Sequence, residues 1–192
     1  RKTLYNAAVT KVSVNVLNSS YTITIDPGLI SRVGVMLREL GPAKRIAVVT
    51  DDNVARLHLH ALLDALRSSE IDALTLIIRA GEEHKNLSTV ASAYDTLLGA
   101  KIDRNTPIIA LGGGVVGDLA GFVAATVLRG IPFIQIPTTL LAMVDASVGG
   151  KTGVDHAVGK NLIGAFHQPI AVMIDPETLK TLPPRELRGG LA

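Results

Sequence analysis

The stretch from Pro107 to Thr126, PIIALGGGVVGDLAGFVAAT, constrains the fold more than any other part of the sequence. It indicates an apolar strand, a glycine-rich turn that ends in an acid, and a helix of small residues. The four glycines between positions 112 and 117 remove side chains, so a ligand can approach the backbone and the chain can adopt positive φ angles. The unpaired amides at the start of the helix favour a phosphate group. The stretch therefore predicts a cradle for a phosphate or a nucleotide.

The glycines of this turn match the dinucleotide pattern G-x-G-x-x-G at Gly112, Gly114 and Gly117. The usual partner of that pattern is an acid about 20 residues later, at the end of the next strand. Here the next expected strand, Phe133 to Ile136, ends in Pro137-Thr138-Thr139. The ordinary Rossmann pattern is therefore incomplete, and a glycine turn that serves only the close packing of helix and strand is the alternative.

Strands and helices alternate along the chain. An expected β-hairpin, with strands at 12–16 and 21–25 and a turn at Asn18-Ser19-Ser20, comes first. The expected helices then lie at 29–40, 53–68, 87–100 and 115–128, and the expected strands at 45–50, 73–78, 107–111, 133–136 and 171–175. This order is typical of βαβ units. We predict an α/β fold with a Rossmann-like parallel sheet flanked by helices and preceded by an N-terminal β-hairpin.

Ligands of parallel sheets lie at the carboxyl ends of the strands. That rule directs attention to residues 51–53, 81–85, 112–118 and 137–145, which all follow expected strands. The section GGKTGVDHAVGKNLIGAFHQP looks long and irregular, and helices are expected to begin after Asp175 and at Pro183-Pro184. The second of these helices has no stop signal before Ala192, so we expect the chain to end inside a helix.

Composition excludes several classes of protein. The net charge is +2, from 19 basic and 17 acidic residues with no block of one sign, and 3% of the residues are aromatic. Nucleic-acid binding needs basic surfaces and stacking platforms, so we expect no nucleic-acid partner. The chain has no cysteine, which fits a reducing compartment, and no window is long and apolar enough to span a membrane. We expect a cytoplasmic protein without a membrane partner.

Basic side chains gather late in the chain. Lys151, Lys160 and Arg129, together with the amide of Asn161, suit a phosphorylated substrate, although solvated surface lysines would give the same pattern. The GGKT sequence at 149–152 resembles the end of a P-loop. An aspartate stands where that motif needs its first glycine, so the ATPase interpretation is rejected.

The histidines give no metal-binding pattern. His58 and His60 lie two apart on an expected helix and point in different directions, so both are expected at the surface. His84, His156 and His167 are scattered over expected loops without the spacing of metal ligands.

Four blocks occur in order along the chain: GGGVVGDLAGFVAAT, RGIPFIQIPTTLLAMVDASVGGKTGVD, GKNLIGAFHQP and LPPRELRGGLA. Together they resemble the 3-dehydroquinate synthase family of sugar phosphate cyclases. The resemblance extends from Thr50 to the last residue, and TTLLAMVDASVGGKT is its most specific part. It implies a carbon–oxygen lyase of the shikimate pathway that converts 3-deoxy-D-arabino-heptulosonate 7-phosphate to 3-dehydroquinate and phosphate, with catalytic NAD and a divalent metal, usually zinc.

The resemblance also implies a set of site residues. The positions that match the family's NAD site are Asp51, Asn53, Glu82, Lys85, Gly113, Gly114, Val115, Asp118, Thr138, Thr139, Lys160, Thr178, Leu179, Lys180 and Thr181. The positions that match its substrate site are Arg129, Asp145, Lys151 and Asn161. Arg129 is expected to reach the substrate phosphate across a homodimer interface. Cations and an amide suit a phosphate, and Asp145 suits substrate hydroxyl groups.

The family's metal ligands are one glutamate and two histidines, and the resemblance places them beyond Ala192, together with the groups for proton transfer. We therefore expect no catalytic residue and no metal ligand here, an NAD-binding domain at 1–177, and the start of a truncated helical domain at 178–192. Without the metal this piece is expected to bind NAD but not to turn over. A valiolone-type synthase and a non-catalytic NAD-binding module are the alternatives, whereas glycerol-type dehydrogenases lack the VDASVGGKTGVD block.

Overall fold

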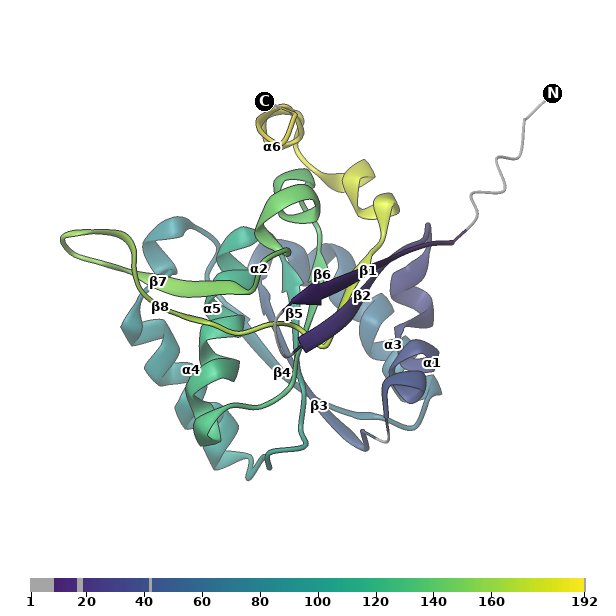
Figure 1. The fold of residues 1–192 in the computed structure, drawn as a ribbon, viewed down its shortest axis with the longest axis horizontal. Helices are drawn as coiled ribbons and strands as arrows, with labels where there is room; N and C mark the ends of the chain where they lie inside the picture. Colours follow the sequence, from purple (N-terminus) through teal and green to yellow (C-terminus); the bar gives the residue numbers. More distant parts are fainter. Residues whose placement is uncertain (1–8, 17–18, 42, 192) are drawn as a thin grey trace.

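The computed structural model describes residues 9–16, 19–41 and 43–191 (Figure 1). Within these residues, a seven-stranded sheet runs in the order β1-β2-β9-β6-β5-β3-β4. The pair β1 and β2 is antiparallel, and every other neighbouring pair is parallel. The strands are β1 (Thr10–Val16), β2 (Ser19–Ile25), β3 (Arg45–Asp51), β4 (Asp72–Ile78), β5 (Ile108–Gly112), β6 (Phe133–Pro137) and β9 (Ala171–Ile174). The predicted α/β fold with an N-terminal hairpin is confirmed.

The strand order determines where a ligand crevice lies. From β3 the chain moves outward to β4, returns to the other side of β3 to form β5, and then continues to β6 and β9. Taken from β3, this is the 2-1-3-4-5 order of doubly wound sheets, which reverses between β3 and β5. Ligands bind outside the carboxyl ends of the strands at that reversal. The loop after β3 and the glycine turn after β5 therefore flank the expected crevice.

Helices cover both faces of the sheet (Figure 1). One face carries the 3-10 turn Leu29–Arg32 with α1 (Val33–Leu40), and α2 (Asp52–Val54), the π-helical turn Ala55–Leu59 and α3 (His60–Ser68). The other face carries α4 (Leu87–Gly99) and α5 (Gly114–Thr126), which ends in the 3-10 turn Val127–Arg129. The predicted helices are present, although the first two are divided by 3-10 or π-helical turns.

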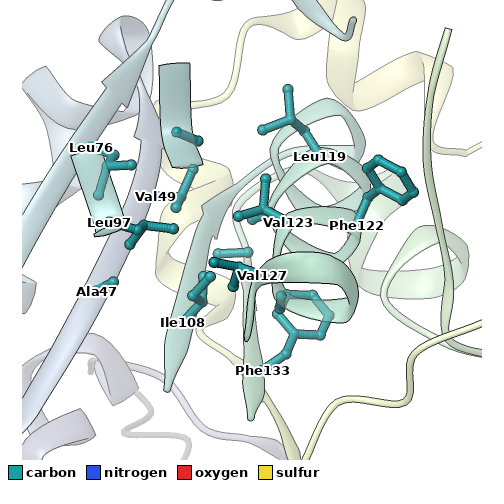
Figure 2. Packing of buried hydrophobic residues seen from close by; sticks show 14 of the residues in the cluster. Ala47, Val49, Leu76, Leu97, Ile108, Leu119, Phe122, Val123, Val127 and Phe133 are labelled. Carbon is teal, nitrogen blue, oxygen red and sulfur yellow. The ribbon is translucent and has the colours of Figure 1, made fainter. Parts of the chain in front are cut away.

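The core consists of two main layers, one on each face of the sheet. Figure 2 shows the layer under α4 and α5, where Val49 and Ile108 of the strands lie near Leu119 and Val123 of α5. Their neighbours along the strands, such as Val48, point into the opposite layer. Because both faces are covered, the central strands carry continuous apolar runs instead of alternating ones.

The section after Gly150 forms a second, two-stranded sheet, so the prediction of a long irregular segment was wrong. Here β7 (Lys151–His156) pairs antiparallel with β8 (Gly159–Phe166), and the hairpin lies against α5 (Figure 1). Glycines concealed the strand pattern in the sequence. They are needed because the backbones approach closely: a Cβ on Gly153 would lie 2.6 Å from the carbonyl oxygen of Ile163.

The chain ends in two short helical segments, as predicted, but the second does not run to the last residue. The 3-10 turn Pro176–Thr181 is capped by Asp175, and α6 covers Pro184–Gly189. The consecutive glycines 189 and 190 disfavour a longer helix. At the other end of the chain, Ser19 and Ser20 belong to β2, and Asn18 of the predicted turn lies outside the described residues.

Candidate functional site

The glycine turn at the end of β5 is tight because side chains have no room there. None of its glycines at 112, 113, 114 and 117 has a positive φ, so the expectation of left-handed geometry was wrong. A Cβ on Gly112 would lie 2.6 Å from Cβ of Val116, and one on Gly117 would lie 2.8 Å from Oε1 of Gln135. The glycines therefore allow α5 to start directly at the end of β5.

The amino end of α5 has no side-chain cap. The N-cap residue is Gly113, and the first backbone N–H to be bonded within the helix is that of Gly117, which donates to the Gly113 carbonyl at 3.0 Å. Free amides and the positive end of the helix dipole together favour an anion. Thr138 and Thr139 lie beside this end: Thr138 donates its N–H to Gly112, and the methyl group of Thr139 is 3.0 Å from the Cβ position of Gly113.

A buried lysine joins three elements next to this turn. Lys85, from the loop after β4, is only 3% exposed. Its ammonium donates to Oδ2 of Asp118 in α5 and to Oδ1 of Asn161 in β8, both at 2.5 Å. Burial raises the pKa of the Asp118 carboxyl, and Lys85 opposes that rise by hydrogen bonding and by its charge. The fold thus brings together residues that are far apart in the sequence.

A cavity of about 520 Å³ opens beside this cluster. Its walls include Asp118 and Asn161, and also Asp145, from the π-helical turn Ala142–Ala146, and Lys151 at the start of β7. Asp145, Lys151 and Asn161 are three of the four predicted substrate residues. The cavity therefore offers a carboxylate, an ammonium and an amide to one small polar ligand.

Arg129, the fourth predicted substrate residue, lies elsewhere. It follows the carboxyl end of α5, whereas the glycine turn precedes the amino end, and the 13 residues of the helix span about 20 Å. Its backbone is unusual, because Leu128 has a φ of 53° and Arg129 a φ of 67°. A single chain does not bring Arg129 to the cavity.

A second hollow, of about 440 Å³, lies between the loop after β4 and the tip of the β7–β8 hairpin. Glu82, Lys85 and Lys160, all predicted for the NAD site, are among its lining residues. Nζ of Lys160 lies 3.2 Å from Oε1 of Glu82, so an exposed ion pair connects the two segments. The aspartate at 155 also lines this hollow and was missed by sequence reasoning, because no motif marks it.

At the end of β3, the predicted NAD residues have structural partners of their own. Oδ1 of Asp51 accepts the N–H groups of Asn53 and Val54, both at 2.9 Å, which caps α2. The side-chain oxygen of Asn53 accepts a hydrogen bond from Arg56. Both residues are at the crevice edge that the strand order identifies, and a ligand would meet their exposed sides.

The stretch Thr178–Thr181 returns to the same region. Thr178 is buried and donates its hydroxyl to the carbonyl of Asp175. Leu179 packs on the small apolar cluster around β2 and β9, and Lys180 pairs with Glu177. These contacts fix the stretch against the sheet.

His58 is not the free surface residue that the sequence suggested. Its Nε2 lies 2.9 Å from Oγ1 of Thr181, and partial burial lowers the pKa of the ring, while the charge of Asp175 works in the opposite direction. His60, by contrast, is 92% exposed. Within the described part of the chain, no three histidine, aspartate or glutamate side chains come together in a way that could hold a metal ion. None of the helices in that part combines the length and the hydrophobicity of a membrane span.

Comparison with known proteins identifies relatives over most of the chain. The family model described as 3-dehydroquinate synthase N-terminal matches residues 75–189. The chain is 55% identical over 181 residues to the 3-dehydroquinate synthase of Pelobacter propionicus, an alignment that covers 94% of this chain and 50% of that protein. It is 53% identical over 175 residues to that of Nitrosomonas europaea, covering 91% and 47%. The chain therefore spans about half the length of these relatives.

Solved structures of two other synthases also match most of the chain. A 2-deoxy-scyllo-inosose synthase in complex with carbaglucose-6-phosphate, NAD+ and Co2+ matches with a TM-score of 0.87 at 28% identity, over 95% of this chain and 50% of that one. A 2-epi-5-epi-valiolone synthase from Streptomyces hygroscopicus subsp. jinggangensis, with NAD+ and Zn2+ bound, matches with a TM-score of 0.83 at 32% identity, over 93% and 49%. The resemblance found in the sequence is thus confirmed, and the chain belongs to the 3-dehydroquinate synthase family.

Proposed function

We propose that this chain is the NAD-binding half of a 3-dehydroquinate synthase. The full-length protein would convert 3-deoxy-D-arabino-heptulosonate 7-phosphate to 3-dehydroquinate and phosphate, as a carbon–oxygen lyase with catalytic NAD and a divalent metal. In this proposal residues 1–177 form the NAD-binding domain and residues 178–192 begin the next one. The observation that carries the proposal is that the uncapped end of α5 and the 520 Å³ cavity are adjacent: Ala146 lines the cavity and lies 3.5 Å from the Cβ position of Gly114.

The amino end of α5 fits the diphosphate of NAD. Gly113, Gly114 and Val115 present backbone without a capping side chain, and Thr138 and Thr139 lie next to it. Amides at a helix start are suited to phosphate oxygens. Relatives of known structure were solved with NAD+ bound. When bound, NAD would accept a hydride from a ring hydroxyl carbon of the substrate and later return it.

Different residues of the cavity would bind the phosphate group and the ring hydroxyl groups of the sugar phosphate. The ammonium of Lys151 and the amide of Asn161 can donate to phosphate oxygens, and the carboxylate of Asp145 can accept hydrogen bonds from ring hydroxyl groups. Lys85 neutralises Asp118 at the boundary between the two ligands. Arg129 would add a further cation only from a second copy of the chain, in a homodimer.

The metal belongs to another part of the protein in this proposal. The described residues contain no group of side chains that fits a divalent ion, and the matched relatives are about twice as long as this chain. We place the ligands in that further part, and zinc as the ion. We also propose a cytoplasmic location, which the biosynthetic role and the absence of cysteine from the chain support.

A valiolone-type synthase is the rival function, because such an enzyme is among the structural matches. Sequence identity favours the main proposal: 55% to a 3-dehydroquinate synthase against 32% to the valiolone synthase.

The test is phosphate release by the full-length protein from the heptulosonate phosphate. We expect release that needs a divalent ion and that continues for many turnovers per NAD. Release without metal, consumption of one NAD per phosphate, or no release from the heptulosonate phosphate would contradict the proposal. The 192-residue chain assayed in parallel should bind NAD and release no phosphate.

A further inference from the structure

Three hydrogen bonds form a closed ring between the loop after β4 and the β7–β8 hairpin. The backbone N–H of Asp155 donates to the carbonyl of Lys85 at 2.8 Å. Oδ1 of Asp155 accepts the backbone N–H of Asn161 at 2.8 Å. The ammonium of Lys85 donates to Oδ1 of Asn161 at 2.5 Å. Each of the three residues therefore contacts both of the others.

Asn161 has an unusual backbone conformation. Its φ is 56°, in the left-handed region, which asparagine adopts more readily than other residues with a Cβ. The carboxylate of Asp155 bonds the N–H of this same residue. Asp155 lies where the register of the hairpin shifts, between Val154 and His156, and such bulges redirect side chains. The bulge thus places a carboxylate within reach of the N–H of Asn161.

The ring also determines which half of the Asn161 amide is available to a ligand. The carbonyl oxygen is bonded to Lys85, so the NH₂ group is the part that remains for the cavity. An NH₂ group can donate to phosphate or hydroxyl oxygens. If the amide were rotated, its carbonyl oxygen would face the ligand instead. The ligand oxygens are also acceptors, so the two groups would repel each other.

We propose that Asp155 is a positioning residue that holds Asn161 in its left-handed conformation, with its NH₂ group available to the sugar phosphate. This inference rests on the proposed function. Asp155 does not line the 520 Å³ cavity, so it acts through Asn161 rather than on the ligand. Its bond to Lys85 comes from the backbone and remains when the side chain is changed. The side chain of Asp155 also lines the second hollow, beside Lys85 and Lys160, so the inference concerns its bond to Asn161 and a larger effect on the sugar phosphate than on NAD.

The test compares Asp155→Ala with Asp155→Asn in the full-length protein. We expect Asp155→Ala to lower kcat/KM for the sugar phosphate about 10- to 100-fold, because the ligand loses an aligned donor. The Kd for NAD should change less than kcat/KM does, because the backbone bond from Asp155 to Lys85 and the ion pair of Lys85 with Asp118 both remain. Asp155→Asn keeps an acceptor oxygen and should stay close to the wild type. The serine side chain is one atom shorter, so its oxygen does not reach the backbone N–H of Asn161. Asp155→Ser should therefore behave as Asp155→Ala does.

Asp103→Ala is the matched control. The carboxylate of Asp103 also accepts a backbone N–H, from Asn105 at 2.8 Å, but in the loop between α4 and β5, away from the site. We expect wild-type kcat/KM from it. Equal losses in Asp155→Ala and Asp155→Asn, or an equal loss of NAD affinity, would overturn the inference.

Crystal structures of the two variants separate this inference from the proposed function. If the wild type released no phosphate, the proposed function would be wrong. The position of Asn161 in the variant structures would still test the positioning role of Asp155. We expect the Asn161 amide to leave Lys85 in Asp155→Ala and to remain in Asp155→Asn. An unchanged Asn161 in Asp155→Ala would refute the positioning role.

Discussion

Packing around Gly121 leaves no room for a side chain at this position. A Cβ on Gly121 would lie 2.4 Å from Cγ2 of Thr152 and 3.1 Å from the ring of Phe133. We expect Gly121→Ala to lower the free energy of unfolding by about 1–3 kcal/mol, because it pushes β7 away from α5. Urea denaturation would measure this. Gly114→Ala, in the same helix, is the control, since its Cβ would meet only Ala146 at 3.5 Å. A loss in Gly114→Ala as large as that in Gly121→Ala would contradict the packing explanation.

Lys151 is expected to bind the phosphate group of the substrate. We expect Lys151→Ala in the full-length protein to raise KM for the sugar phosphate about tenfold or more, because one charge-assisted hydrogen bond to phosphate is lost. The Kd for NAD, measured by titration calorimetry, should stay unchanged. Equal weakening of both ligands would show that Lys151 lies in the other subsite.

Sequence patterns located the glycine turn, but the reason that they gave for its glycines was wrong. The glycines of the turn have no positive φ. They are needed for close packing, and that packing depends on neighbours such as Val116 and Gln135. The burial of Lys85 had no signal in the sequence, because it arises from residues 33 and 76 positions away. Local sequence does not encode such long-range pairing.

Asp175 shows how one side chain joins two elements. Its buried carboxylate accepts the N–H groups of Gly28 and Glu177 on Oδ1 and that of Ile30 on Oδ2. It thereby caps the 3-10 turn after β9 and fixes the segment before α1. We expect Asp175→Ala to lower the free energy of unfolding by about 2–4 kcal/mol, because buried donors lose their acceptor. Thermal and urea unfolding would measure this.

Asp175→Asn is the comparison for that experiment. Its amide keeps one acceptor oxygen, so the loss should be smaller than for alanine. A stability for Asp175→Ala equal to that of the wild type would show that the carboxylate does not hold these elements together.

At the scale of elements, alternation of apolar strands and helices was enough to predict the main sheet. The strands β3 and β5 have continuous apolar runs, and each of the four strands from β3 to β6 lies within two residues of its predicted bounds. The β7–β8 hairpin was missed, because three of its positions are glycine and its pairing depends on packing against α5. Strand propensity depends on such context.

For the whole molecule, the lowered pKa of His58 makes the free energy of unfolding depend on pH. Burial depresses the pKa of His58 in the folded state below its unfolded value of 6.5. A group with a depressed folded pKa contributes stability that is fully present above pH 6.5 and lost as the pH falls through the folded pKa. We expect unfolding free energies of wild type and His58→Gln to converge as the pH falls from 7.5 to about 5. Parallel curves for wild type and His58→Gln would contradict the prediction.

We propose that NAD and a sugar phosphate lie side by side at the carboxyl edge of the sheet. A crystal structure of the full-length protein with NAD and a non-reacting analogue of the heptulosonate phosphate would show where each ligand binds. We predict the NAD diphosphate at the amides of Gly113, Gly114 and Val115, and the analogue in the cavity between Asp145 and Lys151. Electron density for either ligand at another place on the sheet would contradict the claim.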